Sequence, residues 1–123
     1  MKNKTTIMAK KSEKEQAEHE FEKLHDQIKS LHEELSTLSK KSSNDALNRF
    51  KLKVVNDILS RSNGFLGEKY KPFNDFEIFD EASIPTNSDV TMMLGQYLAC
   101  MEKLRYDQSK STGSSTFSGF DGF

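Results

Sequence analysis

All 3 histidines of the chain lie in one segment, HEFEKLHDQIKSLHEEL, which runs from residue 19 to residue 35. Histidine nitrogens and carboxylates bind zinc and exchange protons, so this segment has the residue types of a metal site or an acid/base site. The spacing argues against both. His25 and His32 would lie about 10 Å apart along one helix, too far to share a metal ion there. The zinc-protease pattern HExxH is also absent, because Lys23 and Ser36 stand where a second histidine would be.

The apolar residues of the same segment follow a heptad repeat with alternating steps of four and three residues. We call them the seam residues: Phe21, Leu24, Ile28, Leu31, Leu35 and Leu38. This pattern is typical of a coiled coil and predicts one such helix over residues 12–41. The stripe is narrow, whereas a helix packed on its own domain usually has a wider apolar face. We therefore expect a partner helix in another copy or another protein, with the histidines on the wet flanks.

A second helix is predicted from Asp45 to Ser62, with Asn63 and Gly64 as its C-terminal stop. Its apolar residues cover more than half of the helix circumference, so it must be covered on more than one side. These residues are Leu47, Phe50, Leu52, Val54, Val55, Ile58 and Leu59. Lys51 projects from the same face, where it either extends its ammonium to the edge or pairs with a carboxylate of the acidic segment that follows.

Residues 65–89 read as a long connection whose aromatic side chains plug the core, and a third helix is predicted to follow as far as Tyr106. Cys100 lies at the edge of the apolar face of that helix and is interpreted as a packed side chain rather than a reactive thiol. The opposite side carries small and apolar residues, and a glycine inside a helix is tolerated where another backbone comes close. This strip is a possible second interface: Met92, Gly95 and Ala99.

The C-terminal residues 108–123 are rich in Ser, Thr and Gly, which is typical of a flexible tail. Three phenylalanines recur in it at every third position: Phe117, Phe120 and Phe123. Such aromatic residues either dock in pockets of a partner or cover an apolar patch of their own domain, and both alternatives stay open.

With 123 residues, the chain is long enough for one domain with tails. We expect an all-α protein with a flexible basic arm (1–11), a coiled-coil helix (12–41), a small helical domain (42–107) and a disordered tail (108–123). A single cysteine excludes an internal disulfide and fits a reducing compartment. The N-terminal apolar run is too short for a signal peptide or a membrane span. These features predict a cytoplasmic protein.

No phosphate-binding loop, nucleophile elbow or other catalytic pattern is present in the sequence. We therefore expect no enzyme, no cofactor and no metal. The leading hypothesis is an interaction or assembly protein that forms a dimer or higher oligomer through the seam residues and presents its helical domain and Phe tail to another protein. The alternative is a nucleic-acid-binding accessory factor, although the net charge of -1 argues against a general polyanion binder. Its basic contacts would be Lys40, Lys41, Arg49 and Lys53.

Overall fold

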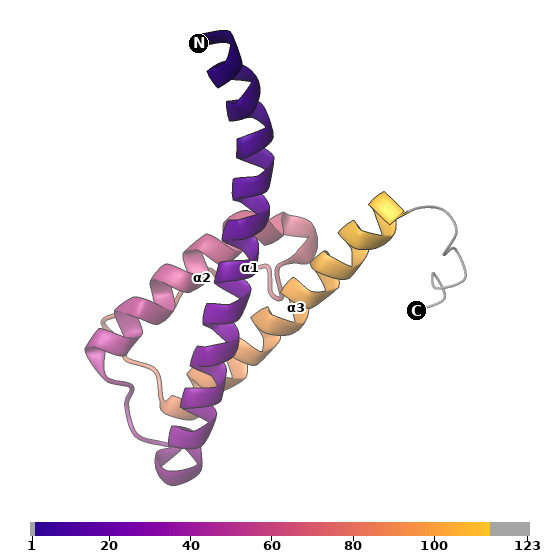
Figure 1. Ribbon diagram of the computed structural model, residues 1–123. Helices are drawn as coiled ribbons and strands as arrows, with labels where there is room; N and C mark the ends of the chain where they lie inside the picture. The colour runs from indigo at the N-terminus through magenta and orange to yellow at the C-terminus, as the bar shows by residue number, and fades with distance from the viewer. Residues whose placement is uncertain (1, 114–123) are drawn as a thin grey trace.

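A computed structural model of the chain describes residues 2–113, with side chains for residues 13–110. It contains three helices, α1 (Lys2–Ser42), α2 (Arg49–Tyr70) and α3 (Asn87–Gly113), and no strand within the described range. Figure 1 shows α1 running antiparallel to both α2 and α3, with its N-terminal part extending beyond them. The prediction of an all-α protein is confirmed. None of the helices in residues 2–113 combines the length and apolar character needed to cross a membrane.

The core lies where the three helices meet, and α1 makes its largest contact with α3. Four of the seam residues are buried there, namely Phe21, Leu24, Ile28 and Leu35. The other two, Leu31 and Leu38, are half-buried against the same core. Thus α2 and α3 supply within one chain the helical cover that the narrow stripe was expected to need from outside. Self-association through the seam residues stays a prediction.

The helix bounds differ from those read from the sequence. α1 begins at Lys2 instead of residue 12, so the expected basic arm continues the helix. α2 begins at Arg49, because the side chain of Asn48 accepts hydrogen bonds from the backbone N–H groups of Phe50 and Lys51 at 2.7 and 3.2 Å. It also runs past Gly64, and its regular geometry is interrupted only at Gly67, where φ is 64°.

The start of α3 is tied to the end of α1. The Thr86 hydroxyl accepts a hydrogen bond from the backbone N–H of Asp89 at 3.2 Å, so Thr86 caps the helix. The side chain of Asn87 donates to the carbonyl of Ser42 at 2.7 Å, at the C-terminus of α1. α3 then continues to Gly113, past residue 107, where the domain was expected to end. The hydrogen bond between Asn87 and Ser42 therefore fixes the start of α3 beside the C-terminus of α1.

Residues 71–86 connect α2 to α3 without a helix. Asn56 of α2 is buried and makes two hydrogen bonds of 2.9 Å with the backbone of Phe79, one donated and one accepted. Phe76 packs edge-on against both Phe79 and Tyr97. The prediction that aromatic side chains of the connection plug the core is confirmed for Phe76 and Phe79, whereas Phe73 is exposed.

Candidate interaction surfaces

The histidines occupy three different environments, and the prediction that all of them lie on wet faces is wrong. His19 is exposed, whereas His25 is only 6% exposed and faces α3. Its Nε2 atom lies 3.3 Å from a carboxylate oxygen of Glu102. The reason is that α1 packs against two helices, so its buried face is wider than that of a two-stranded coiled coil. No group of three or more metal-binding side chains gathers within residues 13–110.

His32 explains the glycine of the possible second interface. A Cβ atom on Gly95 would stand 3.2 Å from Nε2 of His32, which is closer than an ordinary van der Waals contact. Gly95 therefore gives α1 room to approach α3, and the surface that approaches it belongs to the same chain. Met92 and Ala99 are exposed on α3, with Met92 at 56%. Gly95 thus lies against α1, whereas Met92 and Ala99 are exposed to solvent.

Cys100 is half-buried beside the core, as its position at the edge of the apolar face predicted. Burial raises the pKa of its thiol, because the charged thiolate is poorly solvated there. The neutral thiol is a weak nucleophile. This environment fits a packed side chain.

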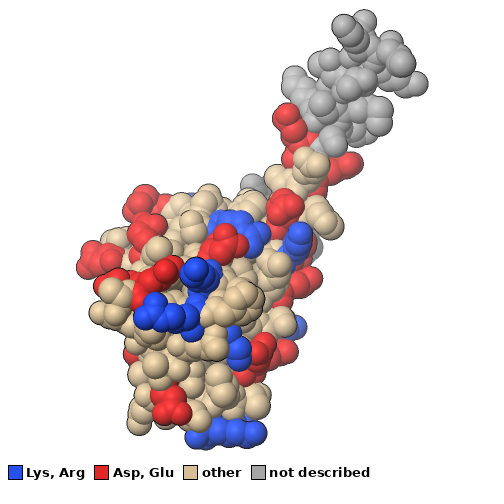
Figure 2. All heavy atoms as spheres, turned by 90° about the vertical axis from the view of Figure 1, so that its left-hand side faces the viewer, with Lys and Arg blue, Asp and Glu red and all other residues tan. Residues whose placement is uncertain are grey.

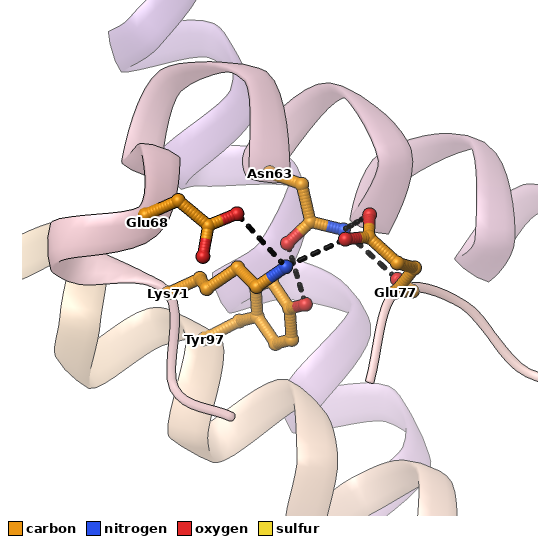
Figure 3. A network of polar contacts seen from close by, with 5 residues as sticks. All are labelled: Asn63, Glu68, Lys71, Glu77 and Tyr97. Atoms are coloured by element: carbon orange, nitrogen blue, oxygen red, sulfur yellow. Dashed lines mark hydrogen bonds and ion pairs between the residues drawn. The ribbon is translucent and has the colours of Figure 1, made fainter. Parts of the chain in front are cut away.

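A polar network joins the end of α2, the connection and α3 (Figure 3). Lys71, with a side chain only 5% exposed, lies 2.6 Å from a carboxylate oxygen of Glu77. Asn63 donates to the backbone carbonyl of Glu77 at 2.9 Å and accepts a hydrogen bond from the Tyr97 hydroxyl at 2.6 Å. Glu68 completes the network at 3.7 Å from Lys71.

This network holds the acidic connection in place and keeps Lys71 charged and Tyr97 neutral at neutral pH. The hydrogen bond with Glu77 raises the pKa of Lys71, so the ammonium stays charged. Burial raises the pKa of Tyr97, so the phenol stays neutral. We interpret the network as a structural tie between helix and connection. It also explains why Asn63 does not end α2, because its side chain is engaged in tertiary contacts.

The four basic residues of the nucleic-acid hypothesis, Lys40, Lys41, Arg49 and Lys53, are all exposed. α1 ends and α2 begins at the same end of the molecule, so the structure brings these residues to that end (Figure 1). Figure 2, which shows the left-hand side of the view in Figure 1, has carboxylates lying beside lysine and arginine side chains. One such pair is Lys51 with Glu34 of α1 at 3.2 Å, so Lys51 pairs with α1 and not with the acidic connection.

A groove of about 570 Å³ runs between α1 and α2, and we call it the α1/α2 groove. Its apolar lining comes from Leu31, Val54 and Ile58. Its remaining lining residues are polar and come from the outer face of α1: His19, Glu22, Lys23, Asp26, Gln27 and Ser30. The groove is the outward side of the least extensive helix–helix contact in the described structure.

Phe50 lies on the same side of α2, one turn before Val54 and two before Ile58. Its side chain is 74% exposed, so its expected place in the core is wrong. The sequence carried a signal for this outcome, because Phe50 is at the edge of the apolar face. The structure also places it in the first turn of α2, whereas the predicted helix began at Asp45. Phenylalanine is among the residue types most often buried, so a ring as exposed as this one, beside a groove, is unusual.

A second groove, of about 670 Å³, opens where α1 and α3 diverge, and we call it the α1/α3 groove. Its floor contains Phe21 and Phe65, whose rings meet edge-on with centroids 5.6 Å apart. Arg105 of α3 and Glu22 of α1 form an ion pair of 2.7 Å at its base. The lining residues farther from the core are polar: Lys14, Glu18, Gln108 and Ser109.

The tail phenylalanines Phe117, Phe120 and Phe123 lie outside the described residues. Comparison of the chain with protein-family models, with curated proteins and with solved structures found no match in any of the three.

Proposed function

We propose that the protein is a non-enzymatic interaction or assembly protein that self-associates and presents its helical domain and its Phe tail to another protein. The observation that carries the proposal is the amount of large apolar surface left outside a complete three-helix core. The exposed side chains are Phe50, Phe65, Phe73, Ile78 and Met92. Scattered apolar residues are normal on a surface, but a ring as exposed as that of Phe50 is costly in water.

Self-association is tested by measuring the mass in solution over a wide range of protein concentration. The chain has a mass of 14.1 kDa, and the proposal expects species of at least twice that mass whose population rises with concentration. A single species of the monomer mass up to millimolar concentration would contradict self-association. The measurement does not depend on which surface the copies use.

The tail part of the proposal is tested by deleting residues 114–123. If the phenylalanines act on a partner, the thermal midpoint and the mass of the shortened chain should equal those of the parent, because a Ser/Gly-rich segment buries little of its own domain. If the same residues cover their own domain, deletion should lower the midpoint and increase the binding of a hydrophobic dye. A lowered midpoint would therefore contradict the partner-binding role.

Nucleic-acid binding is the second candidate function, because Lys40, Lys41, Arg49 and Lys53 are exposed and lie in the last turn of α1 and the first two turns of α2. Contacts with phosphates release counterions, so such binding should weaken steeply as salt rises. Fluorescence anisotropy with a labelled duplex and a labelled single strand checks this at two salt concentrations. Binding that Arg49→Glu with Lys53→Glu does not weaken would contradict the assignment to these residues.

A further inference from the structure

We infer that two copies of the chain pair through the outer face of α2, with Phe50 of each copy inserted into the α1/α2 groove of the other. The inference rests on the proposed self-association and names its surface and its register. A two-fold dimer uses the same patch on both copies, so that patch must carry both a projection and the hollow that receives it. Here Phe50 is 74% exposed and shares its helix face with Val54 and Ile58 of the groove.

The spacing on α2 fits a two-fold arrangement. Phe50, Val54 and Ile58 follow one another at intervals of four residues, which is about 6 Å along the helix. If the two α2 helices lie antiparallel and the axis passes beside Val54, residue 50 of one copy stands level with residue 58 of the other. The aromatic ring then meets the apolar part of the groove, and both copies make this contact at once.

The charges around the groove agree with the same register. Lys51 of α2 pairs with Glu34 of α1, and Phe65 of α2 contacts Phe21 of α1, so the antiparallel alignment of these helices is known at two levels. Counting eight residues back along α1 from Glu34 leads to Asp26, which is level with Leu59 of α2. The two-fold arrangement places Arg49 of the second copy at that level. An acidic side chain thus faces a basic one across the interface.

Both charged partners are accessible for this contact. The side chain of Asp26 is 79% exposed, and one of its carboxylate oxygens lies 3.6 Å from Nδ1 of His25. No lysine or arginine of residues 13–110 forms an ion pair with it. Arg49 is exposed, and no carboxylate of residues 13–110 forms an ion pair with it. Pairing across the interface therefore uses a cation and a carboxylate that the isolated chain leaves in water.

The first test compares the mass of the full chain with that of two variants by sedimentation equilibrium. Phe50→Ser removes the projection, and Ser30→Trp fills the groove from an exposed position. Each should weaken the dimer by about ten-fold or more, since a buried aromatic ring carries much of the energy of such interfaces. Phe73→Ser is the matched control, because Phe73 is an exposed phenylalanine of the connection that does not line the α1/α2 groove, and this change should leave the mass unchanged. Circular dichroism checks that each variant remains helical.

Mixing the two weakened variants separates this interface from any other. The Phe50→Ser chain keeps an open groove and the Ser30→Trp chain keeps its phenylalanine, so their mixture regains one of the two contacts. It should form heterodimers more tightly than either variant forms dimers alone. Arg49→Glu should also weaken the dimer, and Asp26→Arg added to it should restore the association.

The outcomes distinguish this inference from the proposed function. A parent that self-associates while Phe50→Ser and Ser30→Trp have the parental mass would overturn the interface and leave self-association standing. A parent that is monomeric up to millimolar concentration would overturn both, whatever other molecule the groove accepts. Failure of Asp26→Arg to restore the Arg49→Glu variant would overturn the register.

Discussion

Gly95 shows how a single missing side chain sets the distance between two helices. A Cβ atom at this position would stand 3.2 Å from Nε2 of His32. Alanine is favoured over glycine inside a helix by up to about 1 kcal/mol, but here the gain is opposed by the displacement of the imidazole. We predict that Gly95→Ala stabilises a His32→Ala chain by about 0.5 kcal/mol more than it stabilises the parent. Urea unfolding of the four chains measures this difference, and equal effects in both backgrounds would contradict the proposed contact.

Tyr70 and Asp107 form a tie between α2 and α3 that should depend on pH. The tyrosine hydroxyl donates a hydrogen bond of 2.5 Å to the carboxylate, which lowers the pKa of Asp107 in the folded chain. A carboxyl with a lowered folded pKa contributes stability above its unfolded pKa, about 4, and this stability is lost as the pH falls through the folded pKa.

We therefore predict that Asp107→Asn reduces the thermal midpoint at neutral pH and that the gap between parent and variant narrows below about pH 4. Tyr70→Phe removes the donor and should show the same narrowing. Thermal unfolding followed by circular dichroism from neutral pH to about pH 2.5 measures both gaps. A gap that stays constant over this range would show that the carboxylate does not take part in the stabilisation.

The histidines show that a sequence pattern gives the spacing of side chains along a helix but not their burial. The spacing of His25 and His32 was enough to argue against a shared metal ion. Their burial was not predicted, because it depends on how many helices cover α1, and a heptad pattern assumes a single partner. For Phe50 the error was the opposite one, because it was predicted to be buried and is exposed. An apolar residue at the edge of a wide apolar face can lie either in the core or in solvent.

The regular geometry of α2 is interrupted at Gly67 and not at the Asn63–Gly64 pair that looks like a stop signal. Gly67 has a φ of 64° and a ψ of -174°, a backbone conformation that is almost restricted to glycine and costs a residue with a Cβ atom about 1 to 3 kcal/mol. Gly64 lies within the helix and has no atom within 4 Å of the position of a Cβ. The two glycines therefore form a matched pair in the same helix.

We predict that Gly67→Ala and Gly64→Ala change stability in opposite directions. Gly67→Ala should destabilise the chain by about 1 kcal/mol or more, because alanine is strained at this φ. Gly64→Ala should stabilise it by up to about 1 kcal/mol, because it lowers the entropy lost when the helix forms. Denaturant unfolding gives both values. If Gly64→Ala were the more damaging change, the helix would end where the sequence signal suggested.

The number and order of the helices were predictable because their apolar periodicities are strong and long. Their ends were not, because tertiary contacts decided them. Asn48 became the cap of α2 only because residues 43–48 pair with the start of α3, through hydrogen bonds such as Leu47 N–H to the Pro85 carbonyl at 2.9 Å. Asn63 was drawn into contacts with Glu77 and Tyr97, which no local pattern near Asn63 encodes.

The arrangement of the three helices changes the meaning of the heptad repeat in α1. The repeat describes an apolar stripe that needs cover, and it does not say whether the cover comes from the same chain or from another. In the structure, α2 and α3 cover the seam residues from Phe21 to Leu35. The surface available for assembly is then the outer face of α1 and α2, together with the exposed residues of α3.

This arrangement leads to a prediction for Ile28, one of the two fully buried seam residues of α1, the other being Leu35. An unpaired carboxylate placed in a core costs several kcal/mol, a large share of the roughly 5–15 kcal/mol that stabilise a typical domain. Ile28→Asp should therefore lose cooperative thermal unfolding and most of its helical circular dichroism signal at every protein concentration. Ala17→Asp is the matched control, because Ala17 lies on the same heptad stripe but is exposed, and this variant should stay folded. A seam between chains leads to a different result, since Ile28→Asp would then give a folded monomer. Circular dichroism and sedimentation of the two variants decide whether the repeat builds the core of one chain or the contact between two.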